Sequence, residues 1–251
     1  MTVTTAEQGT ARMIGWDRQE RRNAWDLATM TAIADAIEAA GADPSVRSVV
    51  LRGAGGHWSA GDDLQDALVA DSAAWAATMD GFQRLTRVVL AAPVPVIAAV
   101  DGVCVGGALE FAASCDLRLC TDRVRLITPE VNIGLVASNV GTLLLPEVLG
   151  ESAARELLLG GQERDAEWAH GHGFVTELIA PEALEERIHH WIGVFSGTSR
   201  AAVAATKAML NERFGSLLED AMERESRHAE RLFAEGDAQA ALRTFAERRR
   251  S

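Results

Sequence analysis

The sequence predicts an α/β protein with a largely parallel sheet, followed by a C-terminal region that is only helical. Three observations support this prediction. The first third reads as strand, helix and strand, the unit from which parallel sheets are built. Apolar strands then alternate with helices to about residue 180, whereas the segments after Pro181 carry helical patterns alone. With 251 residues and 48% hydrophobic content, the chain is long enough to bury a sizeable core.

Charge and composition exclude several classes of function. A formal net charge of −12 disfavours nucleic acid or an anionic membrane as the main partner, because both are bound through clustered Lys and Arg. No apolar run approaches the ~20 residues needed to span a membrane. The N-terminal MTVTTAEQGTARM has neither a basic head nor an apolar stretch, so we expect a cytoplasmic protein without a secretory signal. Three cysteines without CxxC spacing predict neither a disulfide framework nor a metal site.

The first elements follow from periodicity and capping. Residues 10–16 alternate weakly, as a strand does, and Asp26 is suited to cap a helix that continues to Ala40. Gly41 is expected to end that helix. Residues 46–52 read as a buried strand, and the glycine-rich loop GAGGHWSAGDDL follows it. Because ligands of α/β folds bind at the carboxyl ends of parallel strands, this loop is a candidate binding segment.

The rest of the chain continues the alternation of strands and helices and then becomes helical only. A helix is predicted over 73–90, buried strands over 96–100 and 116–120, a helix over 141–149 and a last strand over 175–179. After Pro181 only helices are predicted, over four segments: 182–195, 199–211, 216–234 and 238–249. We therefore expect an α/β core over residues 1–195 and a helical region over 196–251.

The stretch VDGVCVGGALEFAASCD, residues 100–116, carries the strongest chemical signal. It passes from a strand through the pair Gly106-Gly107 into a short helix that is apolar except for Glu110. Glycines at such a junction let backbone N–H groups approach a ligand, and the helix start adds a positive dipole end, so the junction is suited to hold a negative oxygen. Burial among apolar neighbours should raise the proton affinity of Glu110, as a general acid or base requires.

Two further segments are expected to converge on this junction if the strands share one sheet. SAGDDL, residues 59–64, is a tight loop whose amides can point at an oxygen. Glu130 follows Pro129 at a loop edge, where a solvated residue at a helix start is the common outcome. No GxSxG or GxxxxGK[ST] motif is present, and no GxGxxG follows the first strand. Nucleophilic serine, P-loop and dinucleotide sites are therefore disfavoured.

Five blocks, in order, resemble the enoyl-CoA hydratase/isomerase (crotonase) superfamily over nearly the whole chain. RNAWD at 22–26 is similar to the family's RNAL[ND] turn, and DPSVRSVVLRGAGGHWSAGDDL at 43–64 resembles DxxVRxVVLxGxGxxFxAGxDL. PVPVIAAVDGVCVGGALEFAASCDLRL resembles PxPVIAAVxGxAxGGGxELAxxCDxRx, TPEVNIGL resembles xxPExxxGL, and FAERR resembles FxEKR. The blocks are specific for the superfamily and much less so for one reaction. The resemblance implies an α/β, crotonase-like β-β-α spiral core with a C-terminal helical trimerisation region.

The resemblance also implies a site for an acyl-CoA thioester. The N–H groups of Ala60 and Gly107 match an oxyanion hole, in which fixed dipoles stabilise an enolate oxygen. Glu110 and Glu130 match the two glutamates of hydratases, of which the first activates water and the second exchanges the α-proton. The matching substrate-binding positions are spread over the chain: Asn23, Ala24, Gly61, Asp62, Leu64, Gly106, Ser138, Phe245 and Arg248. No metal and no separate cofactor are implied, since CoA is part of the substrate, and the expected assembly is a homotrimer or a dimer of trimers.

One segment departs from the family's pattern. GLVASNVGTLLL at 134–145 stands where hydratases typically read GLxPGxGGTQRL, so Ala137 replaces a proline and Ser138 replaces a glycine near the acyl pocket. We predict reversible hydration of a 2-enoyl-CoA, because both glutamates are present. Two alternatives remain: a double-bond isomerase that uses Glu130 alone, and a non-catalytic acyl-CoA-binding subunit, for which the altered segment is the sequence hint.

Overall fold

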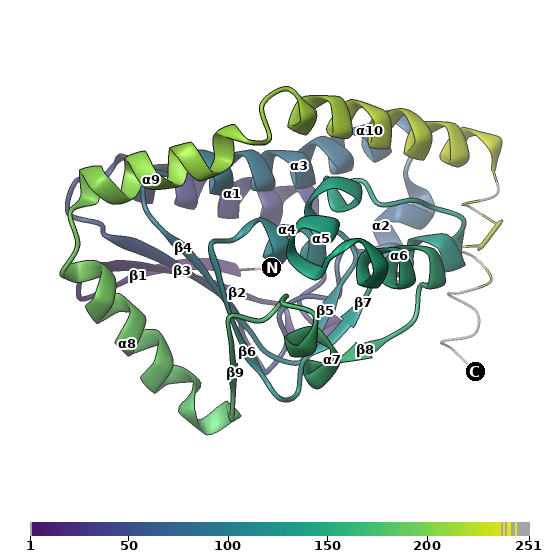
Figure 1. Cartoon of the computed structure of the whole chain (residues 1–251). Helices are drawn as coiled ribbons and strands as arrows, with labels where there is room; N and C mark the ends of the chain where they lie inside the picture. The colour runs from purple at the N-terminus through teal and green to yellow at the C-terminus, as the bar shows by residue number, and fades with distance from the viewer. Residues whose placement is uncertain (1, 237, 239, 242–243, 245–251) are drawn as a thin grey trace.

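A six-stranded sheet lies at the centre of the computed structural model, which describes residues 2–236, 238, 240–241 and 244 (Figure 1). The strand order is β1-β2-β3-β4-β6-β9. Pairing is parallel from β2 to β9, as predicted, whereas β1 runs antiparallel to β2. The strands are β1 (Thr2–Gln8), β2 (Ala11–Asp17), β3 (Ser48–Gly53), β4 (Val96–Val100), β6 (Leu117–Thr121) and β9 (Glu177–Ile179).

The edge strand β1 was not among the predicted elements. Most of its residues are exposed or half-buried and its sequence, TVTTAEQ, is polar, so the apolar alternation that marks a half-buried strand is weak. It is joined to β2 through Gly9, which has a φ of +60° and makes the tight reversal that an antiparallel pair needs.

Helices cover both faces of this sheet. On one face lie α1 (Leu27–Ala42), α3 (Ser72–Ala91) and α4 (Gly107–Ser114), and on the other lies α8 (Leu184–Ser196) (Figure 1). Asp26 caps α1 as predicted, since its side chain accepts a hydrogen bond from the backbone N–H of Thr29. The prediction that Gly41 ends α1 is wrong: the helix includes Gly41, whose missing side chain leaves room for Pro93.

A small second sheet and four more helices complete the core. The sheet, in the order β5-β7-β8, was not predicted, because strands of two or three residues are too short to show a periodicity. It consists of β5 (Val103–Val105), β7 (Arg125–Ile127) and β8 (Arg164–Asp165). The helices are α2 (Leu64–Val69), α5 (Gly141–Leu149), α6 (Glu151–Gly160) and α7 (Ala166–Gly171). Short 3-10 helices span Gln19–Arg21, Glu130–Ile133 and Pro181–Ala183.

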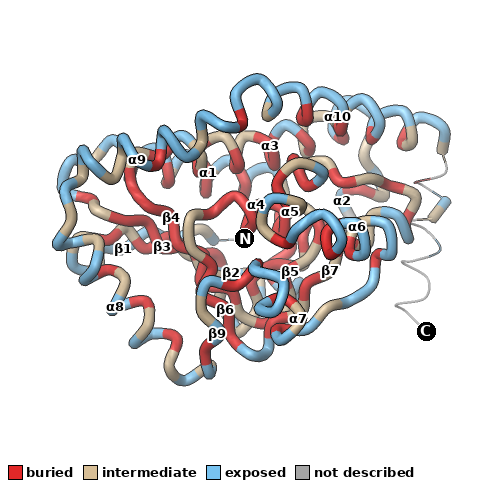
Figure 2. Tube along the Cα trace, viewed as in Figure 1, coloured by how far each residue is buried: buried red, intermediate tan, exposed pale blue. Residues whose placement is uncertain are grey.

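The C-terminal helices pack back on the chain's own core. α9 (Arg200–Glu212) contacts α3, and α10 (Leu217–Glu235) contacts both α3 and α5. Their outer faces are exposed, as the blue tube in Figure 2 shows. Both helices agree with the predicted bounds within one residue; the predicted helix over 238–249 lies mostly outside the described residues. In the part of the chain that the structure describes, no helix has the length and apolar character needed to cross a membrane.

Candidate active site

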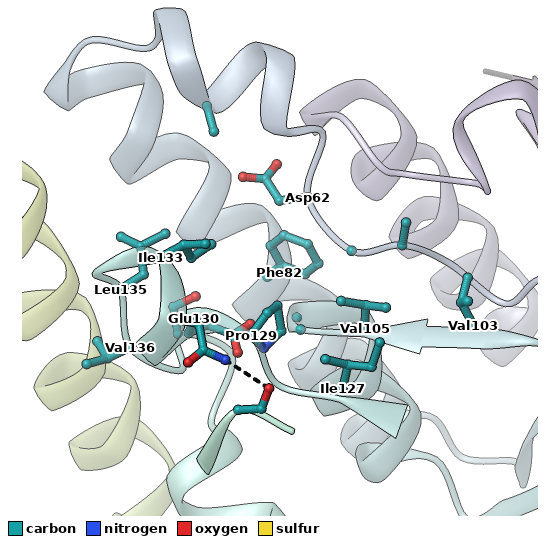
Figure 3. Close-up of a pocket in the computed structure, with 18 of the residues that line it drawn as sticks. Asp62, Phe82, Val103, Val105, Ile127, Pro129, Glu130, Ile133, Leu135 and Val136 are labelled. Atoms are coloured by element: carbon teal, nitrogen blue, oxygen red, sulfur yellow. Dashed lines mark hydrogen bonds between the residues drawn. The ribbon is translucent and has the colours of Figure 1, made fainter. Parts of the chain in front are cut away.

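A cavity of about 370 Å³ is enclosed by the segments that the sequence predicted to converge. Its walls come from the loop after β3, from α3, from β5 and the start of α4, and from the segment that follows β7 (Figure 3). The walls are mainly apolar, with Trp75, Met79, Phe82, Ile133, Leu135 and Val136 among the lining residues. An apolar cavity with a few placed polar groups is the usual form of a small-molecule site.

The two glycine-containing bends lie against each other beside this cavity. The N–H of Ser59 donates to the carbonyl of Val103 at 3.1 Å, and the N–H of Val105 donates to the carbonyl of Ser59 at the same distance. Gly61 has a φ of +80°, and a Cβ there would lie 2.7 Å from the carbonyl oxygen of Val105. Glycine is therefore required at this point for the bends to meet.

Ala60 does not fit its predicted role as an oxyanion donor. Its N–H already donates to the carbonyl of Arg22 at 2.9 Å. The next amide, that of Gly61, donates to the hydroxyl oxygen of Ser59 at 3.1 Å. Both amides therefore stabilise the bend itself and are not available to a ligand oxygen. The next amide along the chain is that of Asp62.

The amide of Asp62 is the free donor. Trp25 pairs with the bend on either side of it: the N–H of Trp25 donates to Gly61 at 2.8 Å, and the N–H of Asp63 donates to Trp25 at 2.9 Å. In such a parallel bridge the central residue's own N–H turns away from the partner strand. Among the described residues the amides of Asp62 and Gly107 have no acceptor, and both residues line the cavity.

Glu130 also lines the cavity, although its sequence position favours a solvated residue. Its Oε1 lies next to Gly106, where an added Cβ would be only 2.6 Å away. Its Oε2 is buried and has no hydrogen-bond partner among the described residues. Burial, with a smaller contribution from the charge of Glu225, raises the pKa of Glu130 to about 7. A carboxyl that titrates near neutral pH can both donate and accept a proton.

Glu110 is fully buried and is not among the residues that line the cavity. Its Oε2 accepts hydrogen bonds from the N–H groups of Asn139 and Gly141 at 2.8 and 2.9 Å, at the start of α5. Its Oε1 is buried without a partner among the described residues. Burial, followed by the charges of Glu225 and Glu130, raises the pKa of Glu110 well above its ordinary value.

A third buried carboxyl, Glu225 on α10, was missed by the sequence analysis. It accepts hydrogen bonds from the N–H of Val140 at 2.7 Å and from the N–H and hydroxyl of Thr142 at 2.8 and 2.5 Å. Glu110 and Glu225 therefore bind alternate amides of four consecutive residues, which satisfies the unpaired donors of the α5 N-terminus. Val140 has a φ of +64°, a strained conformation for a β-branched residue, and Glu225 helps to hold it.

A signal for Glu225 was present in the sequence. It lies on the buried stripe of α10 at a spacing of four residues, between Ala221 and Ala229, where an apolar residue is the rule. A charged residue on such a stripe indicates a buried partner.

The other predicted site residues fall into three groups. Gly106 and Ser138 line the cavity. Asn23 is fully buried and serves the local structure, because its side-chain amide donates to the carbonyls of Ala54 and His57 at 2.8 and 2.7 Å. Ala24 is buried beside Asn23 without lining the cavity, and Leu64 begins α2. Phe245 and Arg248 lie outside the described residues.

Comparison with known proteins agrees with the geometry. The sequence model of the family described as enoyl-CoA hydratase/isomerase matches residues 6–251. Crotonyl-CoA hydratase of Syntrophomonas wolfei is 30% identical over 238 residues, which cover 94% of this chain and 91% of that protein. A putative enoyl-CoA hydratase of Thermus thermophilus is 31% identical over 252 residues, which cover 98% of each chain. The crystal structure of enoyl-CoA hydratase from Bacillus halodurans matches with a TM-score of 0.89 at 24% identity, covering 96% of this chain and 99% of that one.

The structural match confirms the predicted crotonase-like α/β fold, and the family match extends over the core and the C-terminal helices alike. The chain belongs to the enoyl-CoA hydratase/isomerase family.

Proposed function

We propose that the protein adds water reversibly across the double bond of a 2-enoyl-CoA thioester. The observation that carries this proposal is a pair of buried carboxyl oxygens, Oε1 of Glu110 and Oε2 of Glu130, which have no hydrogen-bond partner among the described residues. The charge of Glu130 raises the pKa of Glu110, so the two groups are close enough to interact. Two such oxygens are suited to hold one water molecule between them.

The thioester oxygen would be held by the amides of Asp62 and Gly107. The free N–H groups at the edge of the cavity support this role, and Gly107 adds the positive end of α4. Fixed donors of this kind stabilise the negative charge that develops on the oxygen in the enolate, by about 3–4 kcal/mol for each donor.

In the proposed reaction the two glutamates together carry one proton, with Glu110 ionised and Glu130 protonated at the start. Ionised Glu110 removes a proton from water while the water oxygen bonds to the β-carbon, and the π electrons move to the thioester oxygen as an enolate. When the enolate collapses, protonated Glu130 gives its proton to the α-carbon, which yields a 3-hydroxyacyl-CoA. The raised pKa values of both groups suit these roles of base and acid, because the pair can hold a single proton near neutral pH.

A second candidate is a double-bond isomerase. The observation that favours it is that Glu130 lines the cavity while Glu110 does not. In that reaction Glu130 alone removes a proton from one carbon and returns it two carbons further along, and Glu110 only stabilises the start of α5.

Turnover of crotonyl-CoA and of longer 2- and 3-enoyl-CoA thioesters tests these proposals. Hydration should fall by about 10²–10⁴-fold in both Glu110→Gln and Glu130→Gln, whereas isomerisation should depend chiefly on Glu130. Glu167→Gln is the matched control, because Glu167 is exposed on α7 and does not line the cavity. An unmodified protein that binds acyl-CoA but converts none of these thioesters would reject both reactions in favour of a binding subunit.

We further propose that the assembly is a homotrimer or a dimer of trimers. Exposed apolar side chains on the C-terminal helices support an interface there, with Met209, Leu210 and Leu217 exposed by 62%, 64% and 52%. Sedimentation equilibrium tests this proposal, and a monomer at micromolar concentration would contradict it. The cytoplasmic location and the CoA contacts of Phe245 and Arg248 stay predictions.

A further inference from the structure

Asp62 lines the cavity and brings a carboxyl to it in addition to that of Glu130. Figure 3 shows Asp62 and Glu130 on opposite sides of Phe82 and Ile133, and all four residues line the same cavity. The family pattern AGxDL leaves this position open, so the carboxyl is a feature of this chain rather than of the pattern.

The backbone around Asp62 is held firmly. Trp25 pairs with the residues on both sides of it, as described above, and the neighbouring Asp63 forms an ion pair with Arg18 at 2.7 Å. The side chain of Asp63 is only 5% exposed, so this ion pair stays shielded from water. The backbone of Asp62 is therefore held by contacts at both of its neighbours.

The carboxyl accepts one hydrogen bond, from the backbone N–H of Asp63, and no side chain among the described residues is paired with it. Phe82, Ile133 and other apolar side chains line the surrounding wall. A carboxyl with a single backbone donor keeps hydrogen-bonding capacity that a ligand in the cavity can use. Burial, followed by the charges of Asp63 and Asp66, raises the pKa of Asp62 to about 8. The group is therefore mainly neutral at pH 7 and offers both an O–H donor and an oxygen acceptor.

We propose that Asp62 recognises a neutral oxygen substituent, a hydroxyl or a carbonyl, on the acyl chain of the substrate. This inference rests on the proposed function, because the cavity has to receive an acyl-CoA. A neutral carboxyl matches such a substituent in hydrogen bonding, whereas it offers no compensating charge to a cationic group. Since the amide of the same residue is placed to hold the thioester oxygen, the substituent lies within the first few carbons of the acyl chain.

Binding of two unreactive thioesters tests the inference separately from turnover. Isothermal titration calorimetry should give a Kd for 5-hydroxyhexanoyl-CoA about tenfold lower than the Kd for hexanoyl-CoA, which is the size of one good hydrogen bond. In Asp62→Leu the ratio of the two Kd values should fall to about one, and Asp62→Asn should keep part of the preference because its amide also donates and accepts. Glu167→Gln is the control: it removes an exposed carboxylate on α7 that does not line the cavity, and the ratio should stay as in the unmodified protein.

Two results would overturn the inference: an unmodified protein that binds both thioesters equally, or an Asp62→Leu variant that keeps the preference. If circular dichroism shows Asp62→Leu to be unfolded, Asp62→Ala replaces it, and its ratio of the two Kd values should likewise fall to about one. Failure of the proposed function would look different, because it would remove turnover of every enoyl-CoA and leave the ratio of Kd values in place.

Discussion

Replacing Glu130 with Gln should stabilise the protein above pH 7 while it removes activity. Burial raises the pKa of this carboxyl from 4.5 to about 7, so the folded state binds its proton more tightly than the unfolded state does. The folded protein is therefore disfavoured as Glu130 ionises. This loss of stability begins as the pH rises through the unfolded pKa of 4.5 and is complete above about 7.

The magnitude follows from the two pKa values. One pKa unit corresponds to about 1.4 kcal/mol, so ionised Glu130 lowers the free energy of unfolding by at most about 3 kcal/mol at pH 8. Gln has nearly the same shape and no charge to desolvate, so the variant should recover this amount. At pH 5 most Glu130 is protonated in the folded state, and the gain should be less than about 1 kcal/mol.

Urea unfolding at pH 5 and pH 8, together with turnover of an enoyl-CoA, measures both effects. The expected outcome is a variant that is more stable than the parent at pH 8 and about 10²–10⁴-fold slower. Glu167→Gln should change neither property. An E130Q protein that is less stable than the parent at pH 8 would show that the ionised carboxyl makes a stabilising contact, and it would refute the reasoning.

Three further predictions concern the pair of glutamates and the two bends. The pH profile of kcat/KM should be bell-shaped if the two coupled carboxyls share one proton in a hydratase, and it should reach a plateau at high pH if an isomerase uses one ionised base. Glu225→Ala should lower the free energy of unfolding by more than about 3 kcal/mol in urea titrations, because three donors at the start of α5 lose their acceptor. The control is Glu230→Ala, which removes an exposed carboxylate of the same helix and should change the free energy of unfolding by less than about 0.5 kcal/mol. Gly61→Ala should lower the free energy of unfolding by at least about 2 kcal/mol in urea titrations and weaken acyl-CoA binding, because its Cβ would lie 2.7 Å from a backbone carbonyl oxygen. Gly236→Ala is the control, since Gly236 has a left-handed φ of +84° and open space around it, and it should show only the conformational strain of about 1 kcal/mol.

Long, strongly patterned elements were predictable, and short ones were not. The strand over 96–100 and the helix over 141–149 have the predicted bounds, because unbroken apolar runs and flanking proline or glycine mark them. The three strands of the second sheet were not predicted, although they position the start of α4 and the segment that carries Glu130. Such short strands exist only because distant segments pair with them.

The sequence by itself determined the family, the crotonase-like fold and the presence of two glutamates and two glycine bends. These are matters of residue type and spacing, which the chain carries locally. The tertiary structure decided that the amide of Asp62, and not that of Ala60, is free, because its pairing partner Trp25 lies far away in the sequence. It also decided that Glu225 binds the start of α5 and that Glu130 is desolvated. The direction of an N–H group and the hydration of a carboxyl depend on which distant segments pack around them, so no local pattern could specify either.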